Sequence, residues 1–378
     1  MIQTHHNNVN LLRALAVITV FAHHFSHYTG LSIPWISVFG GLLGVQLFFL
    51  VSGYLIVQSA AHLSWWAFLI NRAFRIFPVY WVVVLIVSIG ISHSLPLTKP
   101  EDWPYFLINF LALGHLVPYA LSFDVLTVSW TLTVEWTWYL LVPLLLWGAQ
   151  RAAIHQVSVR TYWLWISICI IGISTGWMWL AWAGQLDSLY AAGIAKLGIS
   201  PVNEAMRFAF IVVAAPAQWG FFLLGVLLWV YADAWHKLHK IGYVAIALIT
   251  LAKPGWWNSW LPSSLKLDPS ILTGIGLAAV FLLVKDLPTE RLGRLQKAPL
   301  RFLHWIGDIS YPIYLIHVPI IVVIFSYKQF NSMQASSLCL FILLSTASLL
   351  HFLIEIPGRK LGARLINSRP STFSAPLP

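Results

Sequence analysis

Ionisable side chains inside apolar runs are the first candidates for chemistry in this sequence. The run 9–29 holds Arg13 and His24. Because eleven residues make close to three helical turns, the two would share one helix face, about 16 Å apart along the axis. An imidazole titrates near neutral pH and can accept a proton from a hydroxyl nucleophile. We therefore favour a functional role for His24. The nearby His23 and His27 are interpreted as residues at the membrane–water interface, on the outer side of the membrane.

A carboxylate lies inside another apolar run, 127–148. Glu135 and Tyr139 are four residues apart and share a helix face, and Trp130 precedes them in the same run. A carboxylate within lipid needs a cationic or hydrogen-bonding partner. Two interpretations stand equal: Glu135 orients a histidine, as the carboxylate of a catalytic triad does, or it neutralises an arginine.

Two arginines, Arg72 and Arg75, stand three residues apart at the start of the run 76–95. Two forked guanidinium groups on one helix face are suited to a phosphate or a pyrophosphate. Taken alone, however, the pair is better explained as topogenic charge or as a contact with lipid headgroups.

Further polar residues occur in the first and the last two apolar runs. Asn10 lies one helical turn before Arg13, and His317 lies beside Tyr314 in the run 302–326. Glu355 stands near the end of the run 336–357. His317 and Glu355 also have a structural interpretation, since Glu355 is placed to pair with a basic residue four or five positions later.

The overall composition identifies the solvent of this chain. Of its 378 residues, 59% are hydrophobic and 9% are charged, and the mean hydropathy is +0.79. A soluble domain carries about 25% charged residues, so lipid is the main solvent and an all-α, polytopic transmembrane helical bundle is predicted. The net charge of +10 is assigned to cytoplasmic loops and not to nucleic-acid binding. Cys169 and Cys339 lie in apolar runs and are interpreted as small buried hydrophobes, with no disulfide or metal site expected.

Ten apolar runs approach the roughly 20 residues that a membrane span needs. They are 9–29, 38–60, 76–95, 127–148, 161–183, 207–231, 241–253, 270–285, 302–326 and 336–357. The segment 103–122 is also apolar, but Pro104, Gly114 and Pro118 interrupt it, and we treat it as re-entrant or interfacial. With ten spans and both termini in the cytoplasm, most of the 22 basic residues lie inside, as the positive-inside rule requires.

Residues 1–360 are therefore predicted to form one transmembrane domain. Residues 361–378 are predicted to form a cytoplasmic tail, first basic and then rich in Ser and Pro, that is disordered. The outer loops 184–206 and 254–269 are too short to form folded domains of their own.

Six segments, taken in order, resemble the membrane acyltransferase-3 family, the multi-span O-acyltransferases that modify bacterial surface glycans. They are Arg13–Val17 with His24, Gly44–Ile56, Arg72–Pro78, Ser129–Pro143, Tyr314–Pro319, and Glu355 with Pro357. The sequence departs from the family pattern at Gln46, where an acidic residue is common, and at Thr131, where serine is usual. Family members often carry an added hydrolase-like domain, and this sequence is expected to be the membrane domain alone.

The resemblance implies a role for each candidate residue. His24 would be the catalytic histidine, Glu135 would orient His24 or the acceptor, and Arg13 would steady the acyl donor or polarise its thioester carbonyl. Arg72 and Arg75 would bind the phosphates of a cytoplasmic acyl-CoA. Substrate contacts are expected from a further set: Asn10, Trp130, Tyr139, Tyr314 and His317.

The implied reaction moves an acetyl group from acetyl-CoA, a donor substrate and not a permanent cofactor, to a sugar hydroxyl. The acceptor would be an envelope polysaccharide or a lipid-linked glycan, and the protein would lie in the bacterial cytoplasmic (inner) membrane. The main alternative is a transporter or flippase for a lipid-linked sugar, with His24, Glu135 and Arg13 as a proton relay. A second alternative is a relative that binds acyl-CoA without turnover.

Overall fold

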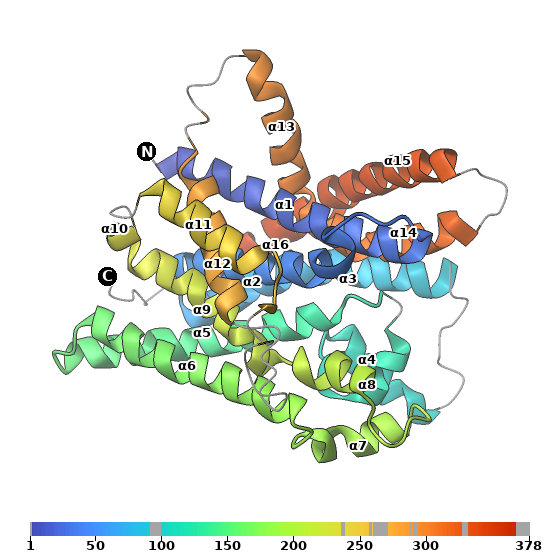
Figure 1. The fold of residues 1–378 in the computed structure, drawn as a ribbon, viewed down its shortest axis with the longest axis horizontal. Helices are drawn as coiled ribbons and strands as arrows, with labels where there is room; N and C mark the ends of the chain where they lie inside the picture. Colours follow the sequence, from blue (N-terminus) through green and yellow to red (C-terminus); the bar gives the residue numbers. More distant parts are fainter. Residues whose placement is uncertain are drawn as a thin grey trace.

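A computed structural model describes residues 2–90, 100–124, 126–235, 239–256, 259, 271–287, 289, 294–326 and 332–367. Throughout these ranges the regular elements are helices, and none is a strand (Figure 1). Large apolar side chains such as Ile86, Trp165 and Phe341 lie exposed on the outer surface. Such a surface is stable in lipid and not in water, so the protein is an all-α polytopic membrane bundle, as predicted.

Six continuous helical segments in the described chain are long and apolar enough to cross a membrane. They belong to α1 (Ile2–Thr29), α2 (Gly41–Ala60), α3 (Trp65–Gly90), α5 (Trp130–Ile154), α6 (Val159–Trp182), and α15 (Ser332–Leu350) with α16 (Ile356–Asn367). Each overlaps one of the predicted spans, although α3 begins eleven residues before the predicted start at 76 and the last segment continues ten residues beyond the predicted end at 357.

Two predicted spans are bent instead of straight. The run 207–231 is divided between α8 (Glu204–Arg207) with the turn that follows it and α9 (Ala215–Val230), at an angle of 48°. The run 302–326 is divided between α13 (Arg294–Asp308) and α14 (Ser310–Ser326), at 76° (Figure 1). Pro216 and Pro312 lie in the first turns of α9 and α14, where a proline starts a helix but cannot continue the preceding one.

The other predicted spans are short helices in the structure. The helices α11 (Lys240–Leu251) and α12 (Ile271–Lys285) pack against each other, and α12 also contacts α2. At 1.5 Å per residue, neither reaches the roughly 30 Å of a bilayer core without its flanking residues. Six to eight spans are therefore assigned by length and composition, and the total of ten stays a prediction, as does the cytoplasmic placement of both termini.

The segment 103–122 contains no helix long enough to span. It forms α4 (Trp103–Phe110) and short 3-10 turns at 114–116 and 118–123, in agreement with the interpretation of this segment as re-entrant or interfacial. Proline and glycine interrupt the helix at the positions that the sequence indicated.

The centre of the bundle is the contact between α2 and α9, the most extensive between any two described helices. A Cβ atom added to Gly53 would lie 1.9 Å from the Phe222 carbonyl oxygen, and one added to Gly225 would lie 2.0 Å from that of Leu50. Only glycine permits this approach, which is typical of small-residue helix contacts in membranes. This close packing holds α2, which carries several site residues, rigidly against the core.

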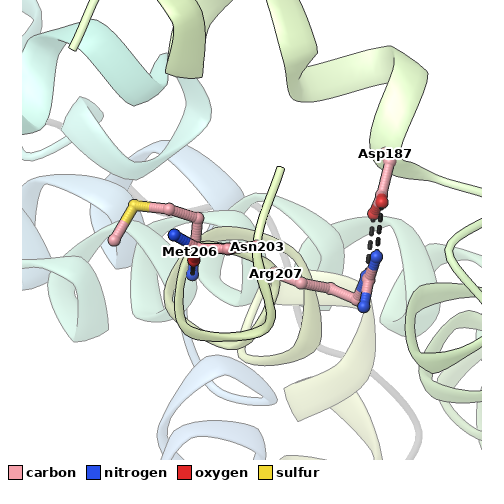
Figure 2. Close-up of polar contacts among 4 residues, drawn as sticks. All are labelled: Asp187, Asn203, Met206 and Arg207. Carbon is pink, nitrogen blue, oxygen red and sulfur yellow. Dashed lines mark hydrogen bonds and ion pairs between the residues drawn. The ribbon is translucent and has the colours of Figure 1, made fainter. Parts of the chain in front are cut away.

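The remaining helices lie in connections. The predicted loop 184–206 holds α7 (Asp187–Ala195), and α10 (Ala232–Trp235) follows α9. Figure 2 shows how the first of these loops is fixed: Arg207 donates two hydrogen bonds to Asp187, at 2.9 and 2.6 Å, and the Asn203 side chain accepts from the Met206 amide. The helix α16 crosses the predicted domain boundary at 360, while 368–378 and most of the loop 254–269 lie outside the described residues.

Candidate active site

Three of the predicted arginines line one small cavity, of about 70 Å³, inside the bundle. Arg13 comes from α1, and Arg72 and Arg75 come from the first half of α3. We call this the arginine cavity; its wall also includes Val45, Phe48, Ser52, Leu55, Thr131, Glu135, Tyr139, Tyr311 and Tyr314. Three guanidinium groups face one carboxylate here, so the cavity suits a ligand with several negative charges.

Arg72 is held in place although it is only 6% exposed. Its Nη2 donates to Ser59 Oγ at 2.5 Å, and its guanidinium carbon lies 5.4 Å from the ring centre of Phe68 and 5.8 Å from that of Tyr139. Cation–π contacts of this kind stabilise a desolvated guanidinium. Among the residues that the structure describes, none bonds the Nε atom, so donor capacity remains for a ligand.

Glu135 lies among the arginines and not beside His24. Its Oε1 accepts from Ser52 Oγ at 3.2 Å, and its Oε2 accepts from the Tyr139 hydroxyl at 3.0 Å. Of the two interpretations of this carboxylate, the structure therefore favours charge balance in the arginine cavity. Neither of these bonds involves His24, so the expectation that Glu135 orients His24 or the acceptor stays a prediction that no described contact supports.

His24 lies in a second and larger cavity of about 650 Å³. We call this the histidine cavity. The last turns of α1, the start of α2, the segment 124–130 and the turn 208–213 enclose it, with wall residues His23, His24, Val45, Gln46, His115, Asp124, Val128, Trp130, Phe208, Thr273 and Tyr314. Its volume is in the range of a small-molecule site, and Trp130 offers a flat aromatic surface in its wall.

The hydrogen bonds around His24 assign its tautomer. His317 Nδ1 lies 2.7 Å from the Tyr314 carbonyl oxygen, and its Nε2 lies 3.1 Å from His24 Nδ1. A carbonyl only accepts, so the proton of neutral His317 is on Nδ1 and its Nε2 is an acceptor. His24 Nδ1 then faces two acceptors, since it also lies 3.0 Å from the Val20 carbonyl, and it must carry the proton. His24 Nε2 keeps a free lone pair, the form that a general base requires.

Several wall residues of the histidine cavity were not predicted from sequence. His115 is buried and contacts the Ala209 carbonyl at 2.8 Å through Nε2, and Asp124 accepts from Ser129 Oγ at 2.7 Å and from the Leu126 amide at 2.9 Å. Burial raises the pKa of the Asp124 carboxyl. Gln46 is fully buried, and neither atom of its amide has a partner in the described part of the chain. In the sequence, Gln46 stood out only as a departure from a family pattern. Its position as a polar residue within a span was the signal that could have identified it as a site residue.

The two cavities meet at α14. Tyr314 and Val45 belong to the walls of both cavities. The Tyr314 hydroxyl lies 3.0 Å from Thr131 Oγ1 and donates to the Val128 carbonyl at 3.2 Å. Although Arg13 and His24 share a helix, they lie in different cavities, so the shared face predicted for them does not place them in one site.

Two polar residues that the sequence analysis singled out, Asn10 and Glu355, have structural partners. Asn10 lines neither cavity and donates to Asp308 Oδ1 at 2.6 Å, where it joins α1 to the bend between α13 and α14. Glu355 is buried and lies 2.8 Å from His351 Nδ1. Of the two basic partners expected later in the helix, Arg359 and Lys360, Arg359 interacts with Glu355 electrostatically. His351 and Glu355 are four residues apart, the spacing that places two side chains on one helix face, and the turn between them is a π-turn.

A search for related sequences identifies the family. The sequence profile described as an acyltransferase domain of the acyltransferase-3 type matches residues 6–354. The chain belongs to this acyltransferase family. The protein is therefore an enzyme that transfers acyl groups. The histidine and arginine cavities are its candidate active site.

Named relatives are similar over most of this chain. Nodulation protein 10 of Rhizobium leguminosarum bv. viciae is 27% identical over 83% of this chain and 82% of its own length. The peptidoglycan O-acetyltransferase OatA of Listeria monocytogenes is 28% identical over 83% of this chain and 49% of its own. The putative peptidoglycan O-acetyltransferase YrhL of Bacillus subtilis is 24% identical over 95% and 55%. The chain thus spans about half the length of the last two, and no solved structure matches it.

Proposed function

We propose that this protein transfers an acetyl group from acetyl-CoA to a sugar hydroxyl of a cell-envelope or exported glycan. The observation that carries the proposal is the pair of cavities that share Tyr314, with three arginines in one and the free Nε2 of His24 in the other. Two relatives bear the name peptidoglycan O-acetyltransferase, which supports a glycan acceptor and an acetyl group.

The donor binds in the arginine cavity. Arg72 and Arg75 hold the CoA phosphates on the predicted cytoplasmic side. The Glu135 carboxylate offsets part of the positive charge of the arginines. Arg13 steadies the donor in the same cavity. A role for Arg13 in polarising the thioester carbonyl does not fit, because Arg13 and His24 are about 16 Å apart along one helix. The flexible pantetheine arm instead carries the acetyl end past Tyr314 toward His24.

The acceptor binds in the histidine cavity, where a sugar ring stacks on Trp130. His24 Nε2 accepts the proton of the sugar hydroxyl, and the oxygen attacks the thioester carbonyl carbon. The carbon–sulfur bond then breaks, the acetyl group stays on the sugar oxygen, and CoA leaves as a thiolate that takes up the proton. General-base assistance of this kind contributes about 10²–10⁴-fold in rate. His317 is a positioning residue, because it contacts His24 and not the cavity.

Purified protein in liposomes, supplied with radiolabelled acetyl-CoA and envelope glycan, tests this function. We expect release of CoA and labelling of the glycan by the wild type, a loss of at least 100-fold in His24→Ala, and little change in His27→Ala. His27 is the matched control because it lies on the same helix, is exposed and lines neither cavity. Full activity in His24→Ala, or no acceptor-dependent CoA release by the wild type, would contradict the proposal.

The expected location is the bacterial cytoplasmic (inner) membrane, because a cytoplasmic donor and an envelope acceptor meet only there. The transporter alternative predicts movement of a lipid-linked sugar across the liposome without CoA release. The same preparation distinguishes the two functions when the distribution of the glycan is measured with and without acetyl-CoA.

A further inference from the structure

The described wall of the histidine cavity holds one carboxylate and no lysine or arginine. Asp124 is the carboxylate, and the other titratable side chains of this wall are those of His23, His24, His115 and Tyr314. An unperturbed imidazole is mostly neutral above pH 7. The arginine cavity has the opposite character, because three guanidinium groups face one carboxylate there. The two cavities therefore differ in the charge of the ligand that each can hold.

The Asp124 side chain is fixed in this wall. Its Oδ2 accepts from Ser129 Oγ at 2.7 Å, and its Oδ1 accepts from the Leu126 amide at 2.9 Å. Burial raises the pKa of Asp124, and both bonds oppose this rise because they favour the ionised carboxylate. Each oxygen can accept a second hydrogen bond, and the residue is partly exposed and lines the cavity. The carboxylate therefore has capacity to accept from a hydroxyl of a ligand.

Trp130 follows Ser129 in the chain and lies in the same wall. Its ring contacts Phe49, with 6.4 Å between ring centres, and His115, with 5.9 Å. The ring is held by these contacts but stays partly exposed. An aromatic ring can cover the apolar face of a sugar while a few placed polar groups bind its hydroxyls. Trp130 and Asp124 together therefore suit a neutral ring that is rich in hydroxyl groups.

We infer that the histidine cavity selects acceptor sugar units that carry no anionic group, and that Asp124 enforces this selection. The inference rests on the proposed function and names its acceptor class. A uronic acid or a phosphorylated sugar would bring its charge into a wall where no described cation can pair with it. An ion that is buried without a partner is strongly disfavoured, and a carboxylate in the same cavity adds like-charge repulsion.

The test is a competition between acceptors in the liposome assay, under mildly alkaline conditions and with deuterated acetyl-CoA. The acceptor mixture contains glycan extracted from the source cells, polygalacturonate and methyl-esterified polygalacturonate. One polymer backbone is thus offered in an anionic and in a neutral form. Mass spectrometry then shows whether the labelled acetyl groups are on neutral or on anionic sugar units.

Two variants change the charge of the wall. Asp124→Asn removes the negative charge and nearly keeps the shape of the side chain, and Asp187→Asn is its matched control because Asp187 lines neither cavity. Val38→Lys adds a cation, and Val38→Gln is its uncharged control. Val38 lines the histidine cavity and is 69% exposed, so this variant keeps the test valid if Asp124→Asn does not fold.

We expect the wild type to label anionic units at least about tenfold less than neutral units. The anionic-to-neutral ratio should rise in Asp124→Asn and in Val38→Lys, by about tenfold where the repulsion is removed, and should keep the wild-type value in both controls. Equal labelling of both kinds of unit by the wild type overturns the inference, and so does a wild-type ratio in both charge variants. Acetyl transfer by the wild type would then leave the proposed function intact, whereas a wild type that labels no glycan overturns both.

Discussion

Replacing His317 tests the hydrogen bonds that set the tautomer of His24. His317→Phe keeps a buried ring of similar size but removes the lone pair that accepts from His24 Nδ1. His317→Gln places a carboxamide oxygen near the position of Nε2 and can still accept this hydrogen bond. The two variants therefore differ mainly in whether His24 Nδ1 keeps its second acceptor.

The expected loss follows from a single hydrogen bond. A net contribution of about 1 kcal/mol corresponds to roughly a fivefold change in rate, since about 1.4 kcal/mol is tenfold. The Val20 carbonyl, which lies 3.0 Å from His24 Nδ1 in the native protein, should still accept this proton in the variant, so the preference for this tautomer is weakened and not reversed. We expect kcat to fall about fivefold to tenfold in His317→Phe, far less than the 10²–10⁴-fold expected for removing the base in His24→Ala.

The assay is acceptor-dependent CoA release in liposomes, with thermal unfolding in detergent to confirm equal folding. A purely structural role for His317 predicts that both variants lose activity in proportion to their loss of stability. Our interpretation instead predicts that His317→Gln recovers most of the wild-type kcat. Full activity in His317→Phe, or a well-folded His317→Gln as impaired as His317→Phe, refutes the reasoning.

Three further predictions follow from particular contacts. Arg72→Lys keeps the charge but loses the forked donors, so the KM for acetyl-CoA should rise about tenfold with a smaller change in kcat; equal effects on both would contradict donor binding. Gln218 is fully buried, and no described residue bonds either atom of its amide, which costs about 1–3 kcal/mol. Gln218→Met should therefore raise the melting temperature by a few degrees, and a lower melting temperature would reveal a missed partner. Asp187→Asn should lower the free energy of unfolding by up to about 1 kcal/mol, and this loss should vanish in an Arg207→Gln background if the bidentate pair of Figure 2 is its cause.

Contacts within one helix were readable from the sequence. The spacing of Arg72 and Arg75 predicted a shared face, and both line one cavity. The spacing of Glu135 and Tyr139 predicted their proximity, and they form a hydrogen bond of 3.0 Å. Helical periodicity fixes such pairs without reference to the rest of the fold.

Contacts between helices were not readable in this way. His24 and His317 are 293 positions apart, and no local pattern relates a residue of α1 to one of α14. The division of Arg13 and His24 between two cavities also depends on α14, because Tyr314 stands at the boundary. Side chains from a distant helix decide which polar groups on one face share a site.

The bends could have been inferred more fully. Pro216 and Pro312 mark the first turns of α9 and α14 in the sequence, yet the apolar runs around them were interpreted as continuous spans. Hydropathy averages over about 19 residues and does not detect a change of direction. The partner of Glu355 was missed for a different reason. His351 lies four residues before Glu355, a spacing that a helix brings together, but only basic residues after Glu355 were considered.

The arrangement of polar groups also bears on the proton-relay alternative. A relay from Glu135 to His24 needs a continuous series of groups that can pass a proton. Between the two cavities stands the Tyr314 ring, whose hydroxyl is engaged by Thr131 and the Val128 carbonyl and, in the part of the chain that the structure describes, by neither member of the relay. A backbone carbonyl cannot pass a proton on. Glu135 and His24 thus lie in different cavities with no hydrogen bond between them among the described residues, and this separation disfavours proton coupling.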